Sequence, residues 1–145
     1  MEIAVEFQER YWYPDDGGEV WVAGYTPVDA SGRFMSREAL AAEGLLVANV
    51  AGAVHRAAAL ESDGAAPGRR LLVRPEPDNP HDPNAVAVLT EEGLALGYVP
   101  RDLASRVGDG WTAIALRERR DSPRDPRTGV TMLLARAETI SLRVT

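Results

Sequence analysis

Apolar and polar residues alternate over short stretches along this chain, which is typical of a protein built from many short strands. Near the start, Ile3, Val5 and Phe7 alternate with polar or small residues, the two-residue period of a half-buried strand. Pro14–Gly18 is rich in turn-forming residues, and Val20–Tyr25 is the expected return strand. The first segment therefore predicts a β-hairpin.

Further strands are predicted wherever a short apolar run is bounded by glycine, proline or polar residues. These runs are 45–50 with its continuation 51–56, then 71–74, 85–89, 94–99, 111–118, 130–136 and 139–144. The last two form either one bent strand or two separate strands, and 57–68 and 119–129 are expected to be loops. Many short strands with few helices predict a mainly β fold, an OB-like small β-barrel of about six strands.

Two short helices complete the expected fold. Ser36 can cap a helix over Arg37–Glu43, which Gly44 would terminate. Pro100 suits the start of a second helix over Arg101–Val107. With 145 residues and no internal repeat, the chain predicts an N-terminal extension at 1–44, hairpin and helix, packed on a barrel formed by 45–145.

The stretch Pro75–Asn84 is the most unusual part of the sequence. It holds four prolines and four Asp or Asn residues between two apolar runs, and we call it the elbow. Each proline fixes its own φ and pushes the preceding residue toward extended conformations, so the elbow is stiff and cannot be helical. A stiff polar loop loses little freedom on contact with a ligand, which favours a binding site.

Two interpretations apply to the polar elbow residues. A carboxylate and an amide on a fixed loop can hold a ligand hydroxyl, with Asp82 accepting its proton and Asn79 donating to a neighbouring oxygen. Alternatively, Asp and Asn side chains accept hydrogen bonds from nearby backbone N–H groups as turn caps. Capping is the favoured interpretation for Asp78 and Asn84, and both interpretations stay open for Asn79 and Asp82.

The elbow and the segment after it also carry a family resemblance. Residues 74–88 read RPEPDNPHDPNAVAV and residues 93–104 read GLALGYVPRDLA. Both resemble the motifs of the HIRAN domain family, densely from Arg70 to Ala104 and less densely over Leu45–Thr145. Members include an accessory domain of DNA-repair helicases and free-standing bacterial proteins. The resemblance implies an OB-like barrel that binds single-stranded DNA at a free 3′-hydroxyl end.

The resemblance also assigns roles to residues. It implies that Asn79 and Asp82 grip the terminal nucleotide, with the aspartate on the 3′-hydroxyl. His81 stands where the family often has Tyr, and it can pack, stack on a base or face water. Tyr98 could stack on a base and Arg101 could bridge a phosphate, a pairing suited to single strands.

Three more residues are candidates for weaker contacts. DNA-binding members place adjacent aromatic residues after the first strand, whereas this chain has His55 and Arg56 there. These two can stack on a base or contact phosphate. Arg74, just before the elbow, is a further phosphate candidate, with solvent exposure as its alternative. The predicted nucleic-acid-binding set is therefore Asn79, His81, Asp82, Tyr98, Arg101, His55, Arg56 and Arg74.

Charge is distributed unevenly along the chain. The net charge is −6, and residues 1–44, with nine acids and three Arg, account for all of it. Residues Arg101–Arg136 contain eight Arg and five acidic residues. This local excess of positive charge suits phosphate binding. All sixteen basic residues are Arg, and neither Lys nor Cys occurs, which excludes disulfides, cysteine zinc sites and catalytic lysines.

The aromatic residues Tyr11, Trp12, Tyr13 and Trp21 flank the first turn. They could stack bases, but the favoured interpretation is a cross-strand core cluster. Exposed together, they would instead mark a partner surface. The acidic N-terminal segment and these aromatics support the alternative function, a protein-interaction or small-ligand module on the same barrel without DNA binding.

The sequence favours a non-enzymatic protein. It contains no triad, no metal-ligand spacing and no phosphate-cradling glycine loop, so neither a cofactor nor a metal is expected. A magnesium nuclease using Asp78 and Asp82 is a weak third hypothesis. We expect a cytoplasmic protein with no membrane contact, because no signal peptide or spanning segment is present. The expected partners are single-stranded DNA and a protein such as a helicase or nuclease.

Overall fold

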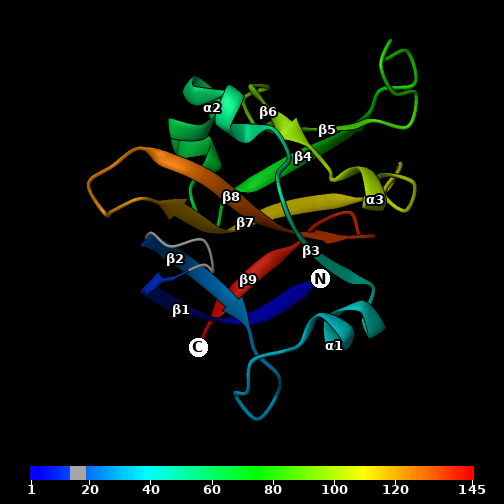
Figure 1. The fold of residues 1–145 in the computed structure, drawn as a ribbon. Coiled ribbons are helices and arrows are strands. Elements are labelled where there is room, and N and C mark those ends of the chain that lie inside the picture. Colours follow the sequence, from blue (N-terminus) through cyan, green and yellow to red (C-terminus); the bar gives the residue numbers. More distant parts are fainter. Residues whose placement is uncertain (14–18) are drawn as a thin grey trace.

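A computed structural model describes residues 1–13 and 19–145 and contains nine strands, three α-helices and two 3₁₀-helices in that part of the chain (Figure 1). The turn expected at 14–18 lies outside the described residues. The strands are β1 (Glu2–Trp12), β2 (Val20–Pro27), β3 (Leu45–Asn49), β4 (Arg70–Pro75), β5 (Val86–Thr90), β6 (Ala95–Tyr98), β7 (Thr112–Arg120), β8 (Arg127–Ala135) and β9 (Ser141–Val144). The helices are α1 (Arg37–Ala42), η1 (Ala53–His55), α2 (Ala57–Glu61), η2 (Asp63–Ala65) and α3 (Arg101–Ala104). No described helix is long and apolar enough to cross a membrane.

Six of these strands form the barrel-like body expected from the sequence. The antiparallel pairs run β6–β5–β4–β7, then β7–β8 and β8–β3. The ends of this series meet at an isolated bridge, where Ala51 N donates to Tyr98 O (2.8 Å) and Tyr98 N donates to Ala51 O (2.9 Å). The mainly β, small-barrel prediction is therefore confirmed, with six strands in the barrel.

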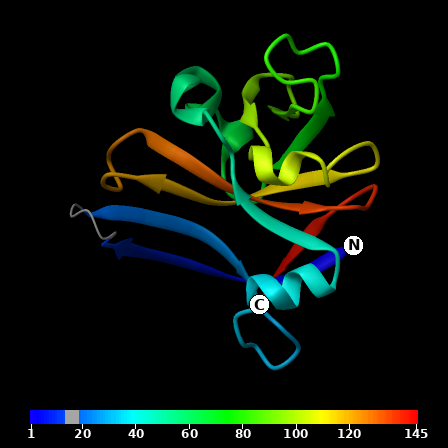
Figure 2. The same cartoon turned by 45° about the vertical axis from the view of Figure 1, so that its right-hand side comes forward.

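The remaining strands form a second layer beneath β7 and β8 (Figure 2). β7 pairs with β4 at Ala113–Ile114, whereas further along the same edge, at Arg117–Arg120, it pairs with β2. β1 continues this layer from β2, and β9 runs parallel to β1. A side chain at Gly24, whose φ is +147°, would overlap the carbonyl oxygen of Leu116. Only glycine allows β2 to approach β7 this closely there.

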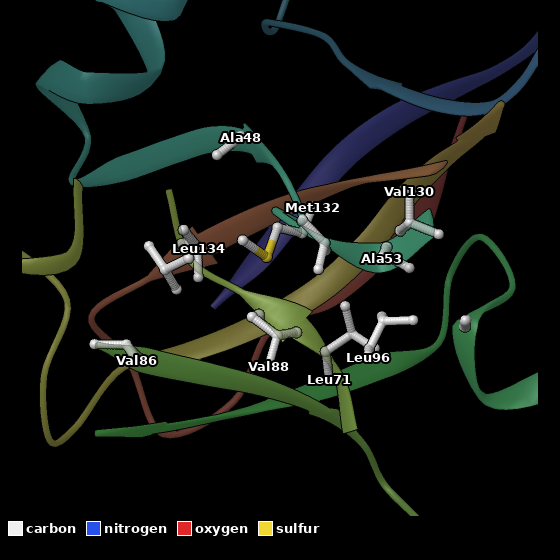
Figure 3. Close-up of a cluster of buried hydrophobic side chains, with 14 of the residues drawn as sticks. Ala48, Ala53, Leu71, Val86, Val88, Leu96, Val130, Met132 and Leu134 are labelled. Atoms are coloured by element: carbon white, nitrogen blue, oxygen red, sulfur yellow. The ribbon is translucent and has the colours of Figure 1, made fainter. Parts of the chain in front are cut away.

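The two layers enclose two hydrophobic clusters. The first fills the barrel and includes Val88, Met132 and Leu134, all fully buried (Figure 3). The second lies between β7–β8 and β1–β9, and it includes Val5 and Leu116. β7 and β8 contribute alternate residues to the two clusters, so their apolar pattern is nearly continuous over the central positions rather than alternating.

Several boundaries differ from the sequence prediction. The strand expected to continue through 51–56 ends because Gly52 adopts a left-handed φ of +76° and starts η1. The loop expected at 57–68 contains α2, since Ala57–Glu61 is an alanine-rich run with high helix propensity. α3 ends at Ala104 rather than Val107, and β7 and β8 extend into the predicted 119–129 loop. The last segment forms two strands, β8 and β9.

The core interpretation of the aromatic cluster is wrong. Tyr11, Trp12 and Tyr13 are 48%, 53% and 69% exposed, and only Trp21 is half-buried. The reason is that the second hydrophobic cluster covers only the start of β1, at Ile3 and Val5. The far end of the β1–β2 hairpin extends beyond that cluster.

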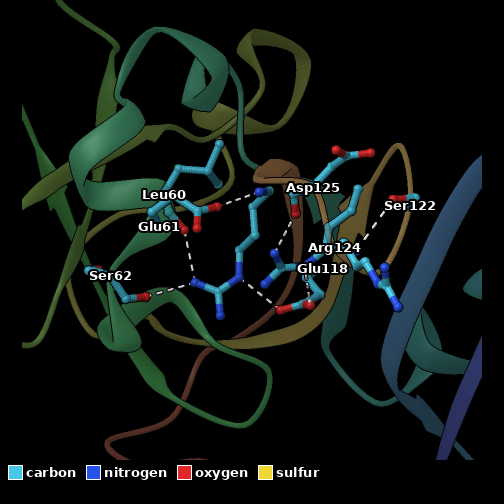
Figure 4. Close-up of polar contacts among 9 residues, drawn as sticks. Leu60, Glu61, Ser62, Glu118, Ser122, Arg124 and Asp125 are labelled. Atoms are coloured by element: carbon cyan, nitrogen blue, oxygen red, sulfur yellow. Dashed lines mark hydrogen bonds and ion pairs between the residues drawn. The ribbon is translucent and has the colours of Figure 1, made fainter.

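An arginine–glutamate network fixes the β7–β8 hairpin to α2 (Figure 4). Glu118, 7% exposed, accepts from Arg120 Nε at 2.7 Å and from Arg127 Nε at 2.8 Å. Arg127 also donates through Nη1 to the carbonyls of Leu60 (2.9 Å) and Ser62 (2.8 Å) at the end of α2. One buried carboxylate therefore holds two arginines, and one of them satisfies the Leu60 carbonyl, which has no partner within the helix.

This network predicts a pH dependence of stability. Burial disfavours the charged form of Glu118, but hydrogen bonds from Arg120 and Arg127 outweigh burial and lower its pKa. Because the pKa is lower in the folded chain than in the unfolded one (about 4.3), Glu118 stabilises the fold above that pH. This contribution is lost as pH falls through the folded pKa. Urea unfolding between neutral pH and pH 3 should show a steeper loss for the native chain than for Glu118→Gln; equal pH dependence would contradict the assignment.

Candidate nucleic-acid interface

The elbow is held by its own side chains and by one closing backbone contact. Asn79 Oδ1 accepts from the backbone N–H of His81 (2.9 Å) and of Asp82 (3.1 Å). Asp82 Oδ1 accepts from the N–H of Asn84 at 2.9 Å. At the base, Glu76 N donates to the carbonyl of Ala85 at 2.8 Å. Asn79 and Asp82 therefore cap the elbow turns, which is one of the two interpretations that the sequence left open for them.

Asn84 does not have the capping role expected from the sequence. Its side chain makes no hydrogen bond to any residue within 1–13 and 19–145, and only its backbone N–H is used. The caps come instead from Asn79 and Asp82, which lie two or three residues earlier than the groups they satisfy, the usual Asx-turn geometry. Asp78 likewise makes no side-chain hydrogen bond to the described chain and is exposed.

Glu76 joins the elbow to β6, a connection that the sequence reasoning missed. Its Oε1 accepts from Tyr98 OH at 2.9 Å and from Asn79 Nδ2 at 3.1 Å. The hydrogen bond to Glu76, followed by burial, raises the pKa of Tyr98, so its hydroxyl stays protonated and remains a donor. Its place between Pro75 and Pro77 was the available signal, because flanking prolines restrict the backbone on both sides.

Tyr98 is also fixed through its backbone. It is the β6 residue of the bridge to Ala51 that closes the barrel. A Cβ at the preceding residue, Gly97, would overlap the carbonyl oxygen of Ala51 and lie 2.7 Å from Val50 Cγ1. Glycine at this position lets β6 approach the end of β3. The position of the Tyr98 ring is thus set by barrel closure as well as by Glu76.

Asp82 has a second oxygen that faces the helix α3. Its Oδ2 lies 3.9 Å from Arg101 Nε, and the Arg101 side chain is 88% exposed. An ion pair this long and this exposed contributes little to stability. Both charged groups are therefore available to a ligand at low cost in folding free energy.

These groups meet at one open cavity of about 320 Å³. Its polar lining comes from the elbow, from β6 and from the start of α3, and small or apolar residues complete the walls. The lining residues are Ala51, Asn79, His81, Asp82, Ala85, Tyr98, Val99, Arg101 and Ala104. The cavity is at the small end of the range for ligand sites, roughly 300–1,000 Å³.

Comparison with known proteins places this geometry in a family. The model of one protein family, the HIRAN domain, matches residues 44–128, more than half of the chain. The chain belongs to the HIRAN domain family. HIRAN domains are nucleic-acid-binding modules, not catalytic by themselves. No curated protein and no solved structure matches the chain.

The HIRAN assignment covers the elbow, β6 and α3, and therefore every residue of the cavity. Five predicted site residues line that cavity: Asn79, His81, Asp82, Tyr98 and Arg101. Arg56 lies close enough to Tyr98 for its charge to lower the tyrosine pKa slightly, against the larger effect of Glu76. His55, in η1, and Arg74, on β4, are exposed and do not line the cavity.

Proposed function

We propose that this HIRAN domain binds the 3′-hydroxyl end of single-stranded DNA in the elbow cavity, during DNA repair or the processing of stalled replication forks. The supporting observation is the convergence of Asp82, Tyr98 and Arg101 on one cavity with a volume that suits a terminal nucleoside. Each group offers what one part of a strand end requires. These parts are a hydroxyl, a base and a phosphate.

The carboxylate of Asp82 divides its two oxygens between structure and ligand. Oδ1 is occupied by the Asn84 N–H, whereas the long contact to Arg101 is the only one that Oδ2 makes among residues 1–13 and 19–145. A 3′-hydroxyl donating to Oδ2 makes a charge-assisted hydrogen bond. Asn79 has one remaining Nδ2 proton after its bond to Glu76, and it can donate to a neighbouring sugar or base oxygen.

Tyr98 and Arg101 then receive the rest of the terminal nucleotide. The Tyr98 ring is oriented by its hydroxyl, and base stacking on such a ring does not depend strongly on base identity. Arg101, being almost fully exposed, can turn from Asp82 to the phosphate that precedes the end. The resemblance implies adjacent aromatic residues near the position of His55 in DNA-binding members; this chain has none there, so Tyr98 is the stacking residue in this proposal.

A competition between strand ends tests the proposal. In fluorescence anisotropy at about 50 mM salt, a short 5′-labelled oligonucleotide with a 3′-hydroxyl should bind about ten- to a hundredfold more tightly than its 3′-phosphorylated counterpart. The reason is that the phosphate removes the donor and brings negative charge to Asp82. As a control, a 5′-phosphate on an unlabelled competitor strand should not lower the affinity of that strand. Equal affinities for both 3′ ends would overturn end recognition.

Protein binding is the second candidate function. The favouring observation is that Tyr11 and Tyr13 are exposed near the end of the β1–β2 hairpin, where large apolar side chains often mark a partner surface. In this reading a helicase or nuclease, rather than DNA, would be the ligand. The native chain should then capture that protein and show no oligonucleotide binding, and Tyr11→Ser combined with Tyr13→Ser should abolish the capture.

A further inference from the structure

Three arginines share one face of the β1–β2–β7 sheet, away from the elbow cavity, and a fourth, on α1, lies near one of them. Arg10 on β1, Val22 on β2 and Arg119 on β7 are direct cross-strand partners, so their side chains lie on one face of the sheet. Arg117 lies on the same face, two residues before Arg119. Arg37 begins α1 and lies close enough to Arg117 to affect its titration. We call Arg10, Arg37, Arg117 and Arg119 the arginine face.

The arginine face lacks carboxylate partners in the described part of the chain. The five ion pairs found among residues 1–13 and 19–145 involve other arginines: Arg69, Arg101, Arg120, Arg127 and Arg143. Within the described residues, Arg117 donates from Nη1 to the Tyr25 carbonyl alone, at 3.1 Å. This is unusual in a chain whose net charge is −6, where acids outnumber arginines.

Arg119 is positioned with donors to spare. Its Nη1 donates to Asn49 Oδ1 at 2.7 Å and to Thr131 Oγ1 at 3.4 Å. Its guanidinium lies over Gly129, where a Cβ would overlap Nη2 and lie 2.8 Å from Cζ. The missing side chain at Gly129 therefore makes room for a flat, half-buried guanidinium whose Nε and Nη2 bond to no described residue.

Arg117 is half-buried and lies among other positive charges, which repel it. Burial and then the charges of Arg10, Arg37 and Arg119 lower the pKa of Arg117. Arginine cannot relieve the repulsion by losing its proton near neutral pH, because its pKa is too high. A bound anion would relieve it, and guanidinium groups match phosphate oxygens in geometry.

We propose that the arginine face is a second nucleic-acid contact, binding the phosphodiester backbone of a single strand independently of its end. Trp12 favours a nucleic acid over an acidic peptide, because it is exposed on the same face of β1, two residues from Arg10, where a base can stack on it. This inference takes only the class of ligand, a nucleic acid, from the proposed function. Arg10 and Arg37 lie outside the family match at 44–128, so half of this contact comes from the chain's N-terminal segment and half from β7.

The test uses the full chain with the double substitution Arg10→Gln, Arg37→Gln. Both side chains are exposed, so folding should be unaffected, which thermal melting checks. The matched control is Arg33→Gln, Arg136→Gln, which removes the same charge from two exposed arginines elsewhere. The probe is a closed circle of single-stranded DNA, which has no 3′ end, compared with a linear strand of the same length.

We expect the Arg10/Arg37 variant to bind circle and linear strand about tenfold more weakly, with a salt-dependence slope shallower by about 1.4, since each released phosphate contact contributes roughly 0.7 for single strands. The control pair should keep the native slope. Equal slopes for the two variants, or a circle that the native chain does not bind, would overturn the inference. The inference would also be overturned if polyglutamate displaced the circle as effectively as DNA of equal charge. If the native chain binds the circle as expected but shows no preference for a free 3′-hydroxyl end, the proposed function is overturned and this second contact is not.

Discussion

Replacing Glu118 with alanine should lower the free energy of unfolding by about 3–5 kcal/mol. The carboxylate is the shared partner of Arg120 and Arg127, whose side chains are only 19% and 8% exposed. Removing it leaves two largely buried arginines without a counter-charge. Removing one partner of a buried ion pair is strongly destabilising, because the remaining charge is buried and uncompensated. Chemical denaturation at neutral pH measures the effect.

Glu2→Ala is the matched control for this prediction. Glu2 also accepts from an arginine Nε, that of Arg143 at 3.0 Å, but both side chains are about 60% exposed. An exposed pair of this kind contributes about 0–1 kcal/mol. If the two alanine variants lose similar stability, burial of Glu118 does not have the energetic consequence assigned to it.

Asp82→Asn should weaken binding of a 3′-hydroxyl strand by about ten- to a hundredfold, with little change in melting temperature. Asparagine keeps an oxygen for the Asn84 N–H but loses the negative charge that faces the cavity. The expected loss is that of one charge-assisted hydrogen bond, roughly 1.5–3 kcal/mol. Asp82→Ala should show the same loss of binding and should also destabilise the fold by about 1 kcal/mol, because it removes the cap as well.

Asn84→Ala is the comparison that separates the two roles of the elbow. Its side chain makes no hydrogen bond to the described residues, so the variant should retain both stability and end preference. Anisotropy and thermal melting on the three variants decide the assignment. A stable Asp82→Asn protein that still prefers the 3′-hydroxyl end would show that Asp82 serves the turn alone.

The sequence predicted that the elbow is a stiff, non-helical loop, because its prolines leave few conformations open. Turn capping was left open for Asn79 and Asp82 and wrongly favoured for Asp78 and Asn84, whereas the GYVPR segment was expected to place Tyr98 and Arg101 next to the elbow. The structure brings Asn79, Asp82, Tyr98 and Arg101 to one cavity. Their contacts with DNA remain predictions. Which oxygen of Asp82 is free depends on the folded turn and could not be read from the chain.

Other features depended on contacts distant in sequence, and pattern reasoning could not reach them. Glu76 contacts Tyr98 across 22 positions, and nothing in the alternation of β6 indicates that partner. The exposure of Tyr11 and Trp12 follows from where the second hydrophobic cluster ends, which depends on β7 and β9 rather than on β1. The division of the chain at residues 44 and 45 remains a prediction.

One edge of β7 pairs with β4 and, further along, with β2. This arrangement limits how the family-matched segment can be separated from the rest of the chain. The family match at 44–128 omits β1, β2 and β9 and cuts β8 near its start. A chain reduced to that range would leave Arg117–Arg120 as an unpaired strand edge and would expose Leu116 to water. Unpaired edges beside apolar surface are templates for aggregation. The boundary of the shared family sequence therefore divides strand pairs and a hydrophobic cluster of this protein.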